Sequence, residues 1–270
     1  MTRPVLLLDS ITDAGPDAAG AVAICGSHGG LYAASLASQA GLHGVILNDA
    51  GIGLNGAGIA GVRALADCGM AACAVDCMSA EIGAASDMQA HGVVSYANAV
   101  AARLGIAPGQ SAAEAADRLG DAPAPTGLMD PVPEARQEVT LAPGAPRVLC
   151  VDSAALIRPG EDDGRIIVTG SHGGLIGGDP ARACKAAARL VAFNDAGIGK
   201  NAAGTTRLPA LQARGIAAVT LDAQSCAIGD ARSGLATGVI SRVNGAAAAL
   251  GLVPETVLCA AIGSPGGLDG

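Results

Sequence analysis

Two histidines stand in the same glycine-rich hexapeptide at two places in the chain. His28 lies in GSHGGL at residues 26–31, and His172 lies in the identical hexapeptide at residues 170–175. Glycine and serine neighbours offer an imidazole little to pack against, so packing does not account for it. Imidazole is also the side chain that gains or loses a proton near neutral pH. We therefore predict that His28 and His172 are catalytic acid/base groups.

A second repeated motif places a carboxylate beside an amide and two glycines. Residues 48–53 read NDAGIG, and residues 194–199 repeat this sequence. If Asp49 and Asp195 accept hydrogen bonds from the histidines, they fix the imidazole tautomer and raise its basicity. Asn-Asp before glycine is also ordinary turn chemistry, in which the side chains bond to nearby backbone amides. Both interpretations of these aspartates stay open, and the first makes them catalytic.

The two copies differ in charge around these loops, because Lys200 and Arg207 in the second copy replace Leu54 and Gly61 in the first. Two cations beside glycine-rich loops favour binding of a carboxylate or phosphate, together with the backbone amides. Cys226, near an expected helix start, is predicted to have a lowered thiol pKa if it is functional. The residues that we expect to bind substrate are Ser27, Gly29, Gly30, Asn48, Gly51, Gly53, Ser171, Gly173, Gly174, Asn194, Gly197, Gly199, Lys200, Arg207, Ser225 and Cys226.

The aspartate loop also fits a cofactor motif. Residues 51–56 (GIGLNG) match G-x-G-x-x-G, residues 197–202 match its alanine variant, and an acid follows at Asp76 or Asp222. In this respect the segment resembles the fingerprint of Rossmann dinucleotide-binding proteins. The Rossmann helix starts at the second glycine, which would place Pro209 deep inside a helix and break it. We therefore expect an open loop, and the sequence indicates no particular cofactor.

Two short blocks also resemble caspase-like His/Cys peptidases, in which a strand ending in His-Gly precedes one ending in Asp-Ala-Cys. Gly51 and Gly197 stand where the nucleophilic cysteine would be, so no peptidase is predicted. Nor is a metal site predicted. Cys68, Cys73 and Cys77 lack paired C-x-x-C spacing, and the second copy has no cysteine at the matching places.

These motifs belong to an internal duplication, which predicts an N-terminal repeat at residues 1–107 and a C-terminal repeat at residues 147–270. The linker, residues 108–146, is rich in Pro and Ala, a composition that favours no regular strand. Within it, the sequence from Ser111 to Glu114 forms a capping box for one short helix.

Each copy alternates short, continuously apolar runs with helical stretches. The runs are residues 5–8, 21–25, 44–47 and 71–75, then 148–151, 165–169, 190–193 and 217–221. Continuous apolarity is typical of parallel strands that helices cover on both faces. We predict an α/β fold of two three-layer, Rossmann-like units with mainly parallel sheets, related by a pseudo-twofold axis. Because the polar motifs follow predicted strands, they should share one crevice at the strands' carboxyl ends.

Helical spacing from Val93 to Leu104 and from Leu235 to Leu250 predicts a last helix in each copy, ending at Gly105 and Gly251. Ser95 with Asn98, and likewise Ser241 with Asn244, would then lie on one face of that helix and have a structural role. In the second copy, Asp179-Pro180 predicts a further helix start after the histidine loop.

Composition limits the classes of partner. The net charge of −8, without a basic cluster and with 1% aromatic residues, excludes a nucleic-acid surface. No apolar run is long enough for a membrane span, and eight cysteines without an export signal favour the reducing cytoplasm. The oligomeric state stays open, a homo-oligomer included.

We therefore predict a small-molecule enzyme of hydrolase or lyase type that acts on an anionic substrate through His/Asp acid-base chemistry. The alternatives are a non-catalytic protein that binds a nucleotide or organic anion and, third, a dinucleotide-dependent oxidoreductase.

Overall fold

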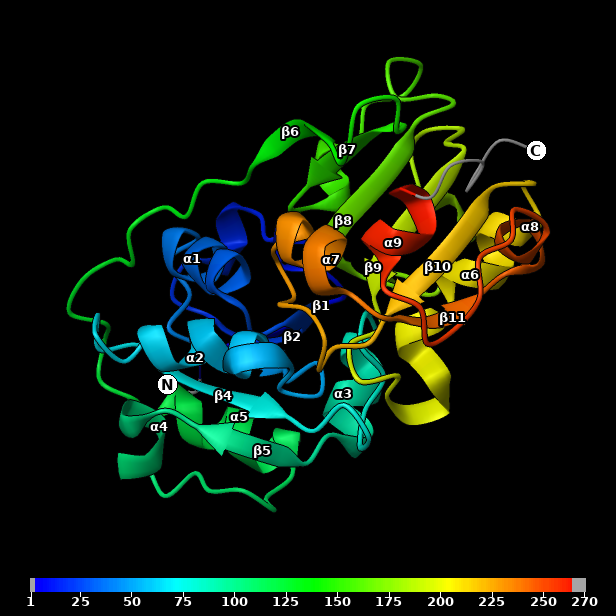
Figure 1. The fold of residues 1–270 in the computed structure, drawn as a ribbon. Coiled ribbons are helices and arrows are strands. Elements are labelled where there is room, and N and C mark those ends of the chain that lie inside the picture. The colour runs from blue at the N-terminus through cyan, green and yellow to red at the C-terminus, as the bar shows by residue number, and fades with distance from the viewer. Residues whose placement is uncertain (1–2, 264–270) are drawn as a thin grey trace.

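A computed structural model describes residues 3–263, which form two α/β units side by side (Figure 1). The N-terminal sheet has five strands in the order β1-β2-β3-β4-β5, and the C-terminal sheet has six in the order β11-β10-β9-β8-β7-β6. Strands β1 to β4 are parallel to one another, as are β7 to β10, whereas β5, β6 and β11 pair antiparallel with their neighbours. The predicted duplication of a mainly parallel α/β unit is confirmed.

All eight predicted apolar runs are strands, within a few residues at either end. The N-terminal strands are β1 (Val5–Leu8), β2 (Val22–His28), β3 (Gly44–Asn48), β4 (Ala71–Val75) and β5 (Val94–Ala97). The C-terminal strands are β6 (Arg136–Thr140), β7 (Arg147–Val151), β8 (Ile166–His172), β9 (Leu190–Asn194), β10 (Ala217–Leu221) and β11 (Ile240–Val243). The central strands β3, β4, β9 and β10 are buried along their whole length, as strands covered on both faces must be.

Helices cover both faces of each sheet. They are α1 (Leu31–Gln39), α2 (Ala60–Ala64), α3 (Ala85–His91), α4 (Ala99–Arg103), α5 (Ala112–Gly120), α6 (Arg207–Gln212), α7 (Ala231–Thr237), α8 (Gly245–Ala249) and α9 (Leu258–Gly263). Short 3-10 helices are η1 (Ile11–Asp13), η2 (Pro16–Ala18), η3 (Leu54–Ile59), η4 (Ala154–Leu156), η5 (Pro180–Arg182) and η6 (Lys200–Thr205). Each sheet carries two apolar clusters, built mostly from Ala, Val, Ile and Leu.

The predicted last helix of each copy is wrong in one respect, because a strand precedes a shorter helix. β5 and β11 are rich in residues of high strand propensity, and each forms an antiparallel edge of its sheet. Ser95 therefore lies on a strand, whereas the Asn98 side chain caps α4 by accepting from the N–H groups of Val100 and Ala101. The expected helix stop holds, since Gly105 follows α4 with φ 76°.

The segment between the repeats contains both a confirmed and a corrected prediction. Ser111 and Glu114 form the expected capping box at the start of α5. A strand was not expected, yet β6 pairs antiparallel with β7, with Val139 opposite Val148. Because this stretch of the linker contains no proline, its backbone is free to cover the edge of β7.

The helix predicted at Asp179-Pro180 is also shorter than expected. Asp179 caps η5 by accepting from the N–H of Ala181, but η5 has three residues and no α-helix follows it before β9.

Reciprocal contacts join the two units. The N–H of Leu54 donates to the Ala223 carbonyl at 2.8 Å, and at the matching positions the N–H of Lys200 donates to the Cys77 carbonyl at 2.8 Å. Gly51 and Gly197 meet so closely that a Cβ on either would lie 2.9 Å from the other's Cα. Contacts exchanged in this way are those expected of a pseudo-twofold axis. Within residues 3–263, no helix is both long enough and apolar enough to cross a membrane.

Candidate functional site

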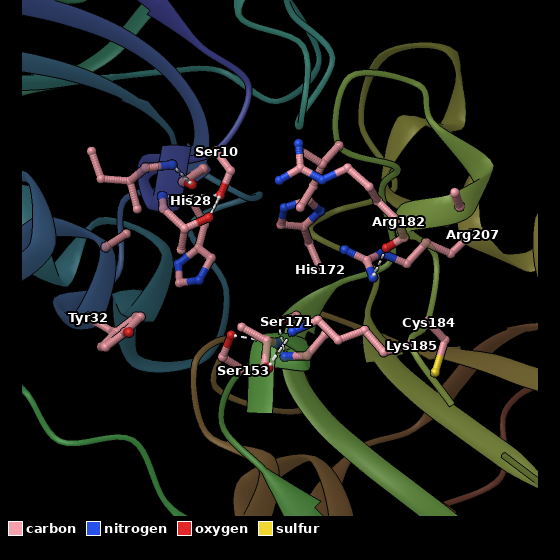
Figure 2. Close-up of a pocket in the computed structure, with 18 residues that line it drawn as sticks. Ser10, His28, Tyr32, Ser153, Ser171, His172, Arg182, Cys184, Lys185 and Arg207 are labelled. Carbon is pink, nitrogen blue, oxygen red and sulfur yellow. Dashed lines mark hydrogen bonds between the residues drawn. The ribbon is translucent and has the colours of Figure 1, made fainter. Parts of the chain in front are cut away.

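A cavity of about 340 Å³ lies between the two units (Figure 2). His28 reaches it from the N-terminal unit, and Ser171 and His172 reach it from the C-terminal unit. The polar and charged residues that line it are Ser10, Thr12, Ser27, His28, Tyr32, Ser153, Ser171, His172, Arg182, Lys185 and Arg207. Its size is within the range of small-molecule sites, which begins at about 300 Å³.

The strand ends place both imidazoles at this cavity. His28 is the last residue of β2 and His172 the last of β8, and the sheet register shifts just before each of them. Gly26, inside β2, allows the neighbouring backbone to approach the strand closely, because a Cβ there would lie 2.6 Å from the Asp9 carbonyl oxygen. The predicted approach of the glycine-flanked histidines to one crevice is therefore what the structure shows for His28 and His172.

Backbone amides determine the tautomer of both histidines. Nδ1 of His28 accepts a hydrogen bond from the N–H of Gly30 at 3.1 Å, and Nδ1 of His172 accepts from Gly174 at 3.2 Å. Since Nδ1 is the acceptor, the proton of a neutral ring is on Nε2. Burial lowers the pKa of His28 to about 4 and that of His172 well below its ordinary value. At neutral pH both rings are therefore uncharged Nε2–H donors.

The serines that precede the histidines are fixed in the same way in both units. Ser27 Oγ accepts from the N–H of Ile11 at 3.0 Å, and Ser171 Oγ accepts from the N–H of Ala154 at 2.9 Å. Because the Ser171 oxygen is held as an acceptor and its own proton has no acceptor among the described residues, this hydroxyl can donate into the cavity.

The cationic residues of the lining all belong to the C-terminal unit. Arg182 forms an ion pair with Asp13 of the other unit at 3.0 Å, and Lys185 Nζ donates to the Ala155 carbonyl at 2.7 Å. No Asp or Glu occurs among the described residues that line the cavity. Donors and cations without a carboxylate make the cavity suited to an anion.

Arg207 is the buried cation of this wall, with 2% of its surface exposed. Nε donates to the Gly174 carbonyl at 3.0 Å, and Nη1 donates to the Ala183 carbonyl at 2.7 Å. The guanidinium also lies over the Phe193 ring, 5.0 Å from its centroid. Within residues 3–263 no carboxylate pairs with it, and burial lowers its pKa to about 10, so it keeps its charge at neutral pH.

Asp49 and Asp195 do not join the histidines. They line a second cavity, of about 420 Å³, together with Asp76 and Asp222. Asp49 Oδ1 accepts from the N–H groups of Gly51 at 2.9 Å and Cys77 at 3.0 Å. Asp195 makes the two matching bonds, at 2.9 and 3.0 Å. The expected His–Asp pair is not formed, and these contacts are those of the turn interpretation.

Three other polar residues that were predicted to bind substrate form hydrogen bonds to nearby backbone groups instead. Asn48 is buried and its Oδ1 accepts from the N–H of Ala50, and Asn194 repeats this contact with Ala196. Ser225 Oγ donates to the Asp222 carbonyl at 2.6 Å.

The glycines that were predicted to bind substrate lie in two kinds of place, either after the histidines or in the aspartate loops. Gly29 and Gly173 directly follow the histidines, and each donates its N–H to the asparagine carbonyl at the end of the neighbouring strand. Gly51, Gly53, Gly197 and Gly199 all have positive φ and lie in the two loops that meet at the axis. η3 and η6 begin directly after the second glycine of each loop, but both are short 3-10 segments interrupted by residues of positive φ. The α-helix α2 begins only at Ala60, so no α-helix starts at the second glycine, as expected, although the loop is not entirely open.

Two polar expectations from the second copy need correction. Lys200 lies outside both cavities and pairs with Asp87 of the other unit at 2.7 Å. Burial raises the pKa of the Cys226 thiol to about 11, so the predicted lowering is wrong. Cys226 lies beside Asp195 and Asp222, whose negative charges also oppose ionisation.

One group in the second cavity has the composition of a metal site. The ligand atoms of Asp49, Asp76 and Cys77 lie within 4.8 Å of one another. Burial raises the pKa of Cys77 to about 12, and Asp49 already accepts two amide bonds. A metal would have to displace the thiol proton of Cys77, and the other unit has Ala223 at this position.

The sequence interpretation missed several residues of the histidine cavity. Ser10 and Ser153 occupy matching places in the two copies, and this repetition was the signal that could have identified them. Arg182 and Lys185 carried no such signal, because their segment has no match in the first copy. Comparisons with protein-family models, curated proteins and solved structures found no match, so the assignment of function rests on the geometry of this site.

Proposed function

We propose that the chain is an enzyme of small organic anions, of lyase or hydrolase type, whose site is the cavity between the two units. His28 and His172 are its paired hydrogen-bond donors, and Arg182, Lys185 and Arg207 provide the positive field that holds the anion. The proposed compartment is the cytoplasm, where the eight free cysteines remain reduced.

The observation that carries this proposal is the shared state of the two imidazoles. Each faces the same cavity with Nδ1 occupied by a backbone amide, which leaves Nε2–H for a bound molecule. A neutral imidazole held in this way acts as an electrophile, because it donates to an oxygen on which negative charge develops. The substrate that fits is an anion with a carbonyl-type oxygen between the rings.

This role differs from the one expected from the motifs. A histidine oriented by Asp49 or Asp195 would accept a proton at Nε2, whereas an imidazole that accepts at Nδ1 donates at Nε2. We therefore assign the histidines to stabilisation of negative charge by hydrogen-bond donation, and we assign the aspartates to the loops.

A binding protein without catalysis is the second candidate, and one observation favours it: no carboxylate lines the described cavity, so an obvious proton acceptor is missing there. Product analysis separates the two candidates. The test is incubation with a panel of oxo acids, hydroxy acids and carboxylate esters, followed by mass spectrometry. Product formation that is lost in His28→Gln and His172→Gln supports the enzyme, whereas a ligand that binds unchanged supports the binding protein.

Anion binding itself is measured by calorimetry with malonate as the probe. We expect the dissociation constant to rise about 10- to 150-fold for each histidine variant, since a hydrogen bond to a charged group is worth roughly 1.5–3 kcal/mol. His91→Gln is the control, because His91 lies on α3 with 60% of its side chain exposed and is not part of the cavity. Equal affinity in the wild type and both histidine variants would contradict the proposal.

A further inference from the structure

A glutamate on the segment between the repeats lies behind the histidine cavity. Glu134 precedes β6, and the hydroxyls of Tyr32 and Ser153 are near enough to its carboxyl group to act on its pKa. Tyr32 belongs to α1 of the N-terminal unit, Ser153 precedes η4 of the C-terminal unit, and both line the cavity. Figure 2 shows Ser153 beside Ser171 and Tyr32 on the N-terminal side. Glu134 thus adjoins the lining from both units.

One oxygen of this carboxyl group has no partner. Glu134 Oε1 is enclosed, and no hydrogen bond reaches it from the described residues. An enclosed carboxylate oxygen without a donor is costly, and the cost disappears when the carboxyl is protonated or when a donor arrives with a bound molecule. The protonated carboxyl and the carboxylate that accepts a donor from a bound molecule therefore both avoid this cost. They differ by one proton, as the two states of a proton-exchanging group must.

Burial and the charge of Asp152 both favour the protonated form of the Glu134 carboxyl group. Burial raises the pKa of Glu134, and the neighbouring Asp152 raises it further, whereas the hydroxyls of Tyr32 and Ser153 work to lower it. Burial and Glu134 together raise the pKa of Tyr32 to about 12, so the phenol stays protonated at neutral pH. Tyr32, Ser153 and Asp152 are the polar groups that influence this carboxyl.

The cavity lacks the function that Glu134 would supply. Both histidines have Nδ1 occupied and present a proton at Nε2, and the cationic side chains are donors. A reaction on a bound anion that moves a proton away from it therefore needs an acceptor beyond the lining.

We propose that Glu134 is the proton-exchanging residue of this site and acts through the hydroxyl of Tyr32 or Ser153. The hydroxyl oxygen takes a proton from the bound molecule as its own proton passes to the Glu134 carboxylate. Two protons shift together, and the net result is the transfer of one proton from the bound molecule to Glu134, with the hydroxyl unchanged. This inference rests on the proposed function, since it assumes an anion in the cavity.

The test is calorimetry of malonate binding at pH 6 in buffers of different ionisation enthalpy, which measures the protons taken up. The negative charge of malonate favours the protonated carboxyl, so wild-type protein should take up protons on binding. In Glu134→Gln the part of this uptake that belongs to Glu134 should disappear, and the same titrations give the malonate affinity of the variant. Asp130→Asn, an exposed carboxylate on the same segment, should change neither quantity.

The outcomes separate the two proposals. If malonate does not bind wild-type protein, the proposed function fails and this inference fails with it. If malonate binds and the uptake in Glu134→Gln equals that of wild type, only the role of Glu134 is overturned. A ¹³C NMR titration of glutamate-labelled protein gives a second measurement without ligand: the resonance lost in Glu134→Gln should titrate above the ordinary glutamate range, and an ordinary titration would overturn the inference.

Discussion

The segments that follow the two histidines differ more than any other matched pair in the molecule. In the N-terminal unit Gly30 leads directly into α1, whereas residues 175–189 of the C-terminal unit contain only η5. Gly177 and Gly178 have φ of 62° and 68°, and Pro180 follows them, so the chain turns away where α1 would have begun. The N-terminal unit has a helix at this place, and the C-terminal unit has a cationic loop.

Gly61 and Arg207, which occupy matching places in the two units, show what the presence or absence of this helix allows. The N–H of Gly61 donates to the Gly29 carbonyl, and the N–H of Arg207 makes the same bond with Gly173. A Cβ on Gly61 would lie 2.2 Å from the Gly30 carbonyl oxygen and 2.5 Å from the Ala34 Cβ, because α1 packs against α2. Where that helix is missing, the side chain of Arg207 occupies the space.

This difference explains the polarity of the cavity. Both units contribute a histidine and serines at matching places, but only the C-terminal unit adds cations, Arg182 and Lys185 from the loop and Arg207 from α6. The two units thus present matching sets of donors, and the C-terminal unit alone adds a positive wall.

The largest effect is expected for Gly61→Ala. Alanine normally stabilises a helix interior, yet here the methyl group would overlap backbone atoms of the preceding helix, so the free energy of unfolding should fall by at least about 3 kcal/mol. Gly120→Ala is the control, because a Cβ on Gly120 in α5 meets nothing within 4 Å, and it should stabilise by about 0.5–1 kcal/mol. Urea denaturation measures both, and equal effects would break the comparison between Gly61 and Arg207.

Arg207→Met tests the other side of that comparison. Methionine fills much of the same space but leaves the carbonyls of Gly174, Arg182 and Ala183 without their donor. The free energy of unfolding should fall by about 2–3 kcal/mol, and malonate affinity should fall with it. Arg242→Met, at an exposed position on β11, should change stability by no more than about 0.5 kcal/mol. A loss at Arg207 no larger than this would show that the guanidinium is not needed in the wall.

The smallest effect expected of a single residue is the pH dependence that each histidine contributes. An unfolded histidine binds a proton below about pH 6.5, whereas folded His28, with a pKa of about 4, stays neutral until lower pH. The unfolding free energy should therefore decrease as the pH falls from 6.5 towards 4, by about 2 kcal/mol for His28 at pH 4.5. Burial and Arg207 both lower the pKa of His172, so its contribution should have the same sign.

Denaturation curves at pH 4.5, 5.5, 6.5 and 7.5 check this dependence. His28→Gln and His172→Gln should each flatten it, because glutamine does not titrate. Parallel curves for wild type and both cavity variants would contradict the neutral, buried state of these rings.

Local patterns allowed the sheets to be predicted and also explain where prediction failed. Continuous apolar runs place the parallel strands, because a strand covered on both faces admits few polar residues. The edge strand β11 was hidden, since Val239, Ile240 and Val243 also fit helical spacing and only pairing with β10 decides between the two. The partner of His28 was predicted as Asp49 but is the N–H of Gly30, because a backbone donor two residues away leaves no trace in residue type.

By itself, the amino-acid sequence determined the duplication, the parallel strands and the two glycine-flanked histidines, since all of these depend on residue type and spacing along the chain. Tertiary structure alone decided that the histidines meet in one cavity and the aspartates in another, and that Glu134 adjoins the lining. These facts depend on how two sheets and a linker come together across an axis, and contacts between such distant segments are set by packing rather than by local pattern.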